Sequence, residues 1–382
     1  MQHFFCYAKI GIQRSKVRKP ERIEVKMSKR ALIAMSGGVD SSVSAYLMKQ
    51  MGYDCVGVTM KLYDNEDINL CDDKTCCSLS DVEDARAVCN KIGIPYYVMN
   101  FKDKFKEKVI DKFVDCYRQG CTPNPCIDCN RHLKFAGLYQ KAKELECDVI
   151  VTGHYVRVEK DEEGFHLYKG KDERKDQSYV LYNLTKEQLA HTIFPLGNLT
   201  KDEVREIAKD NGFINARKKE SQDICFIPDG DYRKFLEEKA QMISKPGDFV
   251  DKGGNFIGKH KGYFHYTIGQ RKGLGISAKE PYYVVDILPG KNQVVLGSNE
   301  DLFKTTLIAN DFNWIEHVKE GEHIQAKIRY AHKQSEATFK ILEDNSVQVT
   351  FKEPQRAFTK GQSVVLYQDE KVLGGGIIHQ IM

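Results

Sequence analysis

A glycine- and serine-rich turn lies between two apolar segments near the start of this chain and limits the folds open to it. Residues 31–35 (ALIAM) form a short continuous apolar run, which is typical of a strand buried on both faces. The sequence SGG at 36–38 interrupts this run, and apolar residues at helical spacing follow over 43–51. A second strand is predicted at 55–60. This strand–helix–strand order predicts a parallel sheet and therefore an α/β domain.

The same alternation continues further along the chain. Helical spacing recurs at 105–120 and 133–145, and short apolar strands are predicted at 95–100 and 149–152. Strands that alternate with helices in this way predict a doubly wound parallel sheet. We assign this α/β domain to residues 27–215.

Beyond about residue 215 the pattern changes to short alternating runs separated by Gly, Asn and Asp. We expect a small, mostly irregular central domain over 216–285 that links the flanking parts. The evenly spaced strand-like runs that follow predict a small C-terminal β-barrel over 286–382.

Composition gives no independent sign of a nucleic-acid partner. The net charge is +4, but residues 1–26 hold seven Lys or Arg against two Glu, so the rest of the chain has a net charge of −1. We expect residues 1–26 to be a disordered leader or the product of an upstream start, with a basic targeting segment as the alternative. No run approaches the roughly 20 apolar residues of a membrane span. The expected compartment is the cytoplasm, without a membrane partner.

The turn after the first strand has the composition of a phosphate-binding loop. Glycines let the backbone approach a phosphate closely, and the N-terminus of the following helix attracts anions. Ser36, Ser41 and Ser42 add hydroxyl donors, whereas Asp40 would repel a phosphate unless it holds Mg²⁺ or orients the loop. The sequence lacks GK[ST], so this is not a Walker A loop. An ordinary glycine turn is the alternative, and the strand–helix context disfavours it.

Two of the twelve cysteines stand in distinctive surroundings. Cys129 lies in TPNPCIDCN (122–130), whose prolines stiffen the segment, just before a helix expected from about Arg131. The dipole of that helix would lower the thiol pKa. Cys225 lies in SQDICFI (221–227). A buried small hydrophobic residue explains either cysteine alone, but the flanking sequences favour a chemical role.

These motifs together carry a resemblance to known enzymes. SGGVDSS resembles the signature of the PP-loop ATP pyrophosphatases, and from Met27 onward the chain resembles the tRNA-specific 2-thiouridylases (the MnmA family). The matching segments occur in family order and cover nearly the whole chain after the leader: SGGVDSS, TPNPC-x-x-CN, TGHY (152–155), KDQSY (175–179), SQDICFI, GQRKGLGI (269–276) and GGGII (374–378).

The resemblance implies an ATP-dependent sulfur transfer to tRNA. In such an enzyme O2 of a wobble-position uridine is adenylated with release of pyrophosphate, and sulfur then replaces it with release of AMP. Cys225 would receive a persulfide from a sulfur-relay protein of a cysteine desulfurase system. Cys129 would be the nucleophile and disulfide partner, and Asp40 would also take part in catalysis. ATP, with Mg²⁺, would bind a set of residues around the loop: Ala34, Met35, Ser36, Gly37, Gly38, Val39, Asp40, Ser41, Met60 and Gly153.

The resemblance also implies tRNA contacts spread along the chain. Residues beside the target base would be Asn124, Pro125 and Cys126. Further tRNA contacts would be His154, Lys175, Asp176, Gln177, Arg329, Tyr330 and Gln362. Basic side chains can meet phosphates and a tyrosine can stack on a base. Spacing alone, however, favours ordinary surface charges for Lys175 and Arg329, and a satisfied histidine at a strand end for His154. The basic glycine-rich loop 269–276 is either a hairpin connection or a tRNA-facing segment.

Cys126 departs from the pattern of many family members, which carry Asp at this position. With Cys129 and Cys225 it supplies three thiolates, enough for a [4Fe–4S] cluster with one open iron. A cluster is therefore an alternative to the persulfide route, on the ligands Cys126, Cys129 and Cys225. A second cysteine-rich set, Cys71, Cys76, Cys77 and Cys121, lacks a standard zinc spacing and favours a flexible loop.

Two other functions remain open at this point. A PP-loop ligase acting on a small molecule would need neither the cysteine pair nor a C-terminal β domain. A non-catalytic RNA-binding protein on the same fold would be expected to have a damaged phosphate loop or to lack Cys129 or Cys225, and all of these features are intact.

Overall fold

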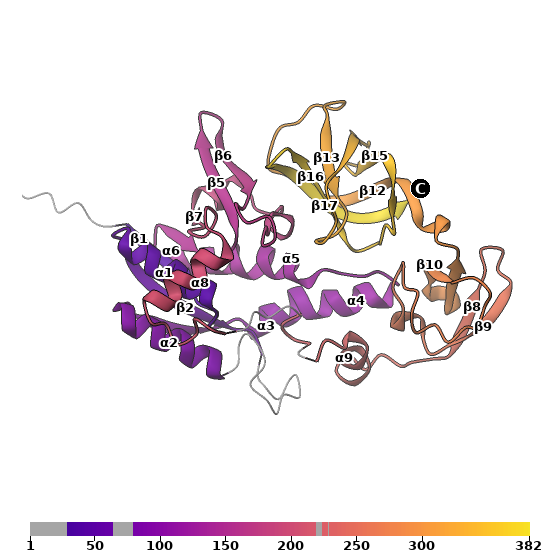
Figure 1. Ribbon diagram of the computed structural model, residues 1–382, viewed down its shortest axis with the longest axis horizontal. Helices are drawn as coiled ribbons and strands as arrows, with labels where there is room; N and C mark the ends of the chain where they lie inside the picture. Colours follow the sequence, from indigo (N-terminus) through magenta and orange to yellow (C-terminus); the bar gives the residue numbers. More distant parts are fainter. Residues whose placement is uncertain (1–28, 64–78, 219–223, 228) are drawn as a thin grey trace, which may run out of the picture.

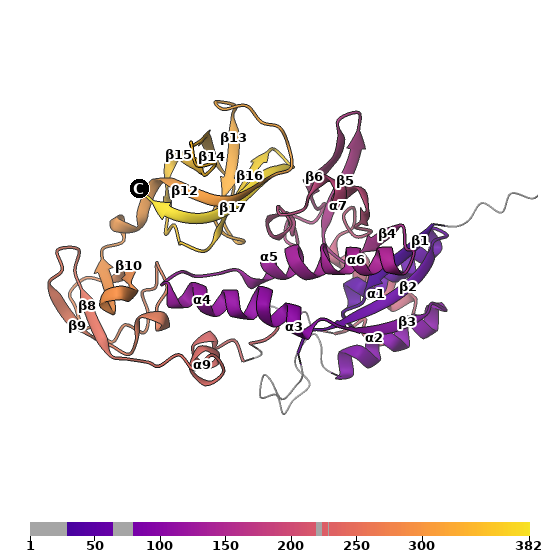
Figure 2. The ribbon, with the colours of Figure 1, turned by 180° about the vertical axis from the view of Figure 1, so that it is seen from behind.

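The computed structural model describes residues 29–63, 79–218, 224–227 and 229–382. The chain forms an N-terminal α/β region, a C-terminal barrel and a central region beyond the far end of helix α4 (Figures 1 and 2). The predicted leader, Cys71, Cys76 and Cys77, and residues 221–223 lie outside the described residues. In the part of the chain that is described, no helix is both long and apolar enough to cross a membrane.

The N-terminal sheet is wholly parallel, as predicted. Its strand order is β3-β2-β1-β4-β7, and every neighbouring pair runs in the same direction. The central strands are almost completely buried because helices cover both faces. The strands are β1 (Arg30–Ala34), β2 (Asp54–Lys61), β3 (Tyr96–Asn100), β4 (Val149–Val151) and β7 (Thr192–Ile193).

Two separate apolar clusters lie on the two faces of this sheet. Ile33 and Val151 pack with residues of α1, α2 and α8 on one face, whereas Leu32 and Ile150 pack with residues of the α3–α6 segment on the other. The doubly wound prediction is therefore confirmed. The helices around the sheet are α1 (Val39–Gln50), α2 (Leu79–Ile92), α6 (Gly137–Glu144), α7 (Lys186–Ala190) and α8 (Lys201–Asp210).

The helices predicted at 105–120 and 133–145 have different bounds. The first begins earlier, and three helical pieces run without a break from α3 (Lys102–Phe105) through η2 (Lys106–Asp111) to α4 (Lys112–Arg118). The second begins eight residues earlier, as α5 (Pro125–Cys129) and η3 (Asn130–Lys134), before α6. Asn124 caps α5 through its side chain, and Pro125 occupies a first-turn position that needs no N–H donor.

The C-terminal barrel is closed, which also agrees with the prediction. Strand β12 pairs with both β15 and β17, so six strands form a ring, and the hairpin β5–β6 extends its sheet from the N-terminal part of the chain. The strands are β5 (Val156–Asp161), β6 (Gly164–Lys169), β12 (Phe303–Trp314), β13 (Ile324–Lys327), β14 (Ser335–Ile341), β15 (Val347–Arg356), β16 (Ser363–Gln368) and β17 (Lys371–Ile381).

The central region is a four-stranded sheet in the order β10-β11-β8-β9. Helix α9 packs on α4 through the stacked rings of Tyr232 and Tyr117, whose centroids lie 4.9 Å apart. Helix α4 therefore connects the N-terminal α/β region with the central region (Figure 1). The remaining elements are β8 (Gly247–Val250), β9 (Phe256–His260), β10 (Tyr283–Leu288), β11 (Gln293–Gly297), α9 (Tyr232–Glu238), η4 (Ser178–Val180), η5 (Tyr263–His265), η6 (Pro289–Lys291) and η7 (Glu300–Leu302).

Candidate active site

The carboxyl ends of β1 and β4 define the place where a ligand should bind. From β1 the chain builds β2 and β3 on one side and returns to β4 on the other, so the strand order reverses between β1 and β4. Open α/β sheets bind ligands in the crevice at such a switch point. The loop 35–38 follows β1 here, and residues 152–154 follow β4.

The phosphate loop depends on glycine at two positions. Gly37 has φ +74°, and a Cβ at this residue would lie 2.3 Å from the carbonyl oxygen of Asp81. Gly153 faces the start of α1, where a Cβ would lie 2.9 Å from the backbone of Asp40. The segments that follow β1 and β4 therefore approach the backbone of α2 and α1 more closely than a residue with a side chain would permit.

The loop is also fixed by its own serines and by Asn215. The Ser36 N–H donates to the Ser41 hydroxyl at 3.2 Å, and Ser41 donates to the Gly38 carbonyl at 3.0 Å. Asn215 donates to the Gly37 carbonyl at 2.9 Å and to the Ser42 hydroxyl at 2.8 Å. Gly38, the N-cap of α1, has no side chain that could cap the helix, and its own N–H donates to the Ser36 hydroxyl at 3.4 Å. The first turn of α1 follows directly, and a helix N-terminus suits an anion.

Asp40 is held by two groups from distant parts of the chain. The Lys201 ammonium lies 2.8 Å from both carboxylate oxygens, and the Tyr155 hydroxyl donates to Oδ1 at 2.7 Å. Lys201 is buried, with 4% of its surface exposed. Because both oxygens are engaged, this arrangement favours the loop-orienting role of Asp40 over direct Mg²⁺ binding.

A second lysine lies beneath the loop. Lys218 contacts carboxylate oxygens of Asp81 and Asp84, each at 2.6 Å, and lies 3.5 Å from the Gly37 carbonyl. These contacts raise the pKa of Lys218 despite its partial burial. Lys218 therefore offsets one of the two negative charges that Asp81 and Asp84 place near the loop.

Cys129 lies at the last position of α5 and is buried. The expectation that it sits at a helix N-terminus is wrong, because Pro125 starts the helix one turn earlier and η3 continues it without interruption. Of the two cysteines in α5, the exposed Cys126 is the one in the first turn, and its N–H donates to the Asn124 side chain at 3.2 Å. The helix dipole argument therefore does not apply to Cys129.

One cavity of about 340 Å³ joins the phosphate loop to the cysteines. From the predicted ATP set it is lined by Ala34, Met35, Ser36, Asp40, Ser41, Met60 and Gly153. From the predicted sulfur and tRNA sets it is lined by Pro125, Cys126, Cys129, His154, Gln177 and Cys225. The lining does not include Gly37, Gly38, Val39, Asn124, Lys175, Asp176, Arg329, Tyr330 or Gln362.

His154 lies inside this cavity as a neutral imidazole. Burial, reinforced by the nearby Lys134 ammonium, holds the pKa of His154 well below its usual range. Its Nδ1 lies 2.7 Å from the Thr152 hydroxyl and its Nε2 lies 3.5 Å from the Lys134 Nζ. Lys134 can only donate, so Nε2 accepts and Nδ1 carries the proton.

The other predicted tRNA residues occupy varied positions. Asp176 is buried, and its carboxylate accepts from Gly170 and Ser178. Gln362 donates to the Thr122 carbonyl at 2.8 Å and so holds the segment that leads into α5. Tyr330 is 43% exposed on the barrel, with Arg329 beside it half-buried. Lys175 is also half-buried.

Sequence reasoning missed several residues of the cavity. Lys134 is the only Lys or Arg among the described residues that line it. Asn130 also lines it: its side-chain NH₂ donates to the Val180 carbonyl, while its buried side-chain oxygen has no hydrogen-bond partner among the described residues. Both follow Cys129 on the same helical segment, and that spacing of one and five residues was the available signal.

The three cysteines proposed as cluster ligands line the same cavity but do not form a metal site. Among the described residues no three His, Cys, Asp or Glu side chains are grouped closely enough to hold a metal ion. The described residues thus offer no single-ion site at these cysteines, and we derive no step through a [4Fe–4S] cluster. Mg²⁺ commonly binds through one or two carboxylates and the nucleotide phosphates, so it would arrive with ATP.

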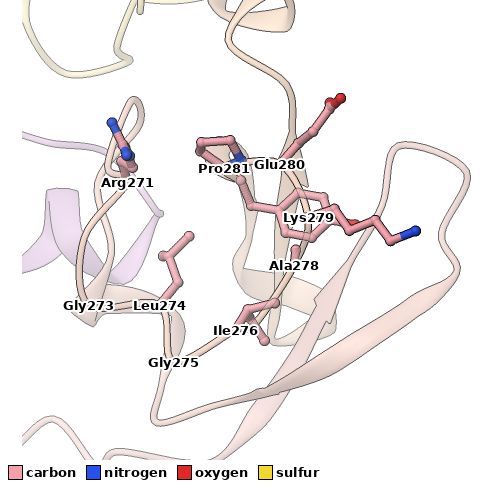
Figure 3. A pocket seen from close by; sticks show the side chains of 10 residues that line it. Arg271, Gly273, Leu274, Gly275, Ile276, Ala278, Lys279, Glu280 and Pro281 are labelled. Carbon is pink, nitrogen blue, oxygen red and sulfur yellow. The ribbon is translucent and has the colours of Figure 1, made fainter.

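The basic glycine-rich loop encloses a separate cavity of about 290 Å³ in the central region. Figure 3 shows Arg271 and Pro281 on opposite sides of the opening, with Leu274 and Ile276 below and the Lys279 amine directed away. Gly273 and Gly275 both have positive φ, which shapes the turn. Of the two cations in the loop 269–276, Arg271 lines this cavity.

The fold and the cavity define an ATP-utilising enzyme of the PP-loop class. Family models match the chain in three parts: a tRNA methyl transferase HUP domain over residues 29–229, a tRNA methyl transferase PRC-barrel domain over 233–298 and an aminomethyltransferase beta-barrel domain over 304–378.

Curated relatives narrow the class to one family. The tRNA-specific 2-thiouridylase MnmA of Clostridioides difficile (strain 630) is 54% identical over 93% of this chain and 99% of its own length. The enzyme of the same name from Clostridium beijerinckii is 53% identical, over 93% of this chain and 100% of its own. The chain belongs to the tRNA-specific 2-thiouridylase (MnmA) family. A 4-thiouridine synthetase–RNA complex with bound ATP shares 19% identity over 56% of this chain and 50% of its own, with a TM-score of 0.34, too low to bear on function.

Proposed function

We propose that this protein thiolates the wobble-position uridine of tRNA at C2 in an ATP-dependent reaction. The observation that carries the proposal is the single cavity that joins the phosphate loop to Cys129 and Cys225. A nucleotide on the loop and a base beside the cysteines would meet in that cavity. The relatives that match nearly the whole chain are named for this reaction.

The first step is adenylation. O2 of the uracil attacks the α-phosphorus of ATP, and pyrophosphate leaves into the cradle formed by the loop and the start of α1. Lys201 neutralises Asp40, so the loop presents no uncompensated negative charge to the nucleotide. Lys134 would supply positive charge where negative charge develops on the phosphates or on the leaving AMP.

The second step is sulfur transfer. The terminal sulfur of a persulfide on Cys225 attacks C2, and AMP departs with the former O2. The Cys129 thiolate then attacks the Cys225 sulfur, which releases the 2-thiouridine and leaves a Cys129–Cys225 disulfide. A thiol reductant must reopen this disulfide, and a sulfur-relay protein must reload Cys225, before the next cycle.

Several side chains would orient these groups. Tyr63 donates to the Cys225 carbonyl at 2.9 Å and so anchors the segment that carries the persulfide. The buried side-chain oxygen of Asn130, one residue after Cys129, is an acceptor suited to the N3–H of a uracil. Arg329 and Lys175 would meet tRNA phosphates and Tyr330 would stack on a base or ribose, with the central domain and barrel extending the contact surface.

The test is ATP-dependent thiolation of unmodified tRNA by the wild type, Cys129→Ser and Cys225→Ser. Both variants should form no 2-thiouridine while still releasing pyrophosphate on addition of tRNA. Cys147→Ser, at a buried cysteine outside the cavity lining, is the matched control and should stay active. Full thiolation by either cavity variant would contradict the sulfur-transfer assignment.

A second measurement separates the persulfide route from the cluster. The protein is purified anaerobically, and its iron and acid-labile sulfide are assayed beside its activity with a persulfide donor. We expect full activity in iron-free protein. Activity that tracks iron content would overturn the persulfide route.

A further inference from the structure

Cys116 and Cys121 lie together at the end of α4, away from the active-site cavity. Residues 116–121 close the helix with a Schellman motif: the Cys121 N–H donates to the Cys116 carbonyl at 2.9 Å, and the Gly120 N–H donates to the Tyr117 carbonyl at 3.0 Å. Gly120 has φ +73°, as the motif requires. In this motif the side chains five residues apart turn toward each other.

The barrel confirms that both side chains converge on one point. A Cβ on Gly361 would lie 2.7 Å from the Cys116 sulfur and 3.0 Å from the Cys121 Cβ, so the pair packs against the same glycine. The two thiols also share a hydrogen bond. Both side chains are only partly buried, so small reagents can reach them.

The two thiols are chemically unequal. The hydrogen bond from Cys116 and the nearby Lys360 ammonium lower the pKa of Cys121 to about 7 against the opposing effect of burial. The same hydrogen bond and burial raise the pKa of Cys116. Near neutral pH Cys121 is therefore the nucleophilic member of the pair, and Cys116 is the thiol positioned to resolve a bond formed on it.

We propose that Cys116 and Cys121 form a reversible dithiol–disulfide site that reacts with low-molecular-weight disulfides. The Cys121 thiolate attacks one sulfur of the reagent, forming a mixed disulfide and releasing one thiolate. Cys116 then attacks the Cys121 sulfur, forming the Cys116–Cys121 bond and releasing the second thiolate. The protons lost by the two cysteines end on the two released thiols, so two cysteines are oxidised as one disulfide is reduced.

The site lies at a sensitive place in the fold. Directly after Cys121, Thr122 donates to the Lys360 carbonyl at 2.8 Å and accepts from Gln362 at 2.8 Å. Asn124 then caps the helix that carries Cys129. Oxidation of the pair would act on residues 122–124, which are hydrogen-bonded to the barrel and lead into α5, without using Cys129 or Cys225.

The test uses full-length protein with Cys126→Ser and Cys129→Ser, so that Cys121 is the only cysteine in the tryptic peptide 119–131. The folded protein is treated with glutathione disulfide, alkylated and digested, and peptides 113–118 and 119–131 are analysed by mass spectrometry. We expect the two peptides to be linked through Cys116 and Cys121 and to separate on reduction. Cys55, whose pKa burial raises to about 11, should remain unmodified as the internal control.

Two variants in this background make the result decisive. Cys116→Ser should accumulate a stable glutathione adduct on Cys121, and Cys121→Ser should leave Cys116 unmodified. A thermal unfolding midpoint close to that of the parent shows that each variant is folded. Separate peptides with both cysteines alkylated, or a glutathione adduct that persists on Cys121 when Cys116 is present, would overturn the proposal. These readouts do not depend on tRNA thiolation.

Discussion

The ammonium of Lys201 lies 2.8 Å from both carboxylate oxygens of Asp40, across the base of the phosphate loop. The lysine comes from the first turn of α8 and the aspartate from the first turn of α1. This pair ties together two helices on the same face of the sheet. It also cancels the one negative charge that the loop would otherwise present to a nucleotide.

Replacing Lys201 by Met should destabilise the protein by up to about 3 kcal/mol, because a partly buried carboxylate loses its partner. The KM for ATP, measured by pyrophosphate release, should also rise. Urea unfolding and initial rates measure both effects. Lys201→Met with Asp40→Asn should recover much of the stability, since no unpaired charge remains. A double variant no more stable than Lys201→Met would contradict the pairing argument.

Lys134→Met should lower kcat/KM for thiolation by about ten- to a hundredfold, because the cavity loses its cation near the developing phosphate charge. Steady-state rates at varied ATP measure this. Lys141→Met is the matched control: Lys141 lies on α6 and pairs with Glu144 at the surface. Equal losses in the two variants would mean that the Lys134 charge has no special role.

His154 should give a pH dependence of stability. Its folded-state pKa lies well below the value of about 6.5 for the unfolded chain. The stability that neutral His154 contributes is therefore fully present above about pH 6.5 and is lost as pH falls, because this imidazole binds a proton in the unfolded state but stays neutral in the folded state. Between pH 7.5 and 5.5 the wild type should lose about 1.4 kcal/mol more than His154→Gln. Equal losses in urea unfolding would contradict the neutral, buried assignment.

Gln362→Ala should slow thiolation two- to tenfold, in line with one hydrogen bond of about 0.5–1.5 kcal/mol, and leave tRNA affinity nearly unchanged. Gln362 holds the Thr122 carbonyl, so its loss should loosen the approach to α5. Single-turnover thiolation and tRNA binding separate the two effects. A fall in affinity without a fall in the single-turnover rate would instead support a direct tRNA contact.

Arg329→Ala should weaken tRNA binding and reduce the slope of log K against log salt concentration by about 1, because one phosphate contact is lost. The KM for ATP should not change. Lys352→Ala, another barrel cation, pairs with Glu336 at the surface and serves as the control. A slope that stays the same in Arg329→Ala would place this residue outside the tRNA interface.

The fold was largely predictable because its signals are local. A buried strand, a glycine turn and an amphipathic helix follow each other within 30 residues at the start of the sheet. The start of α5 was missed because the sequence TPNPC was interpreted as a stiff loop. Asn124 and Pro125 are in fact a cap and a first-turn proline, and that distinction moved Cys129 from the beginning to the end of a helix.

The site was predictable only where a motif marked it. The loop and the two cysteines were marked by their flanking sequences, Met60 and Gly153 came from the family resemblance, and the cavity brings many of these residues together. Lys201 lies 161 residues from Asp40 and sits in an ordinary amphipathic helix, so nothing local distinguishes it from a surface lysine. Long-range charge pairing of this kind becomes visible only when the chain is folded.

The hairpin β5–β6 gives the chain a constraint in time as well as in space. Tyr168 pairs with Lys371, and the Lys169 N–H donates to the Glu370 carbonyl at 2.9 Å. During synthesis the hairpin emerges from the ribosome about 200 residues before its partner strand. Until then it presents an open strand edge, which is prone to wrong pairing. When β17 forms, it closes the barrel by pairing with β12 and also covers part of the β6 edge, so one strand completes two pieces of the fold made far apart in time.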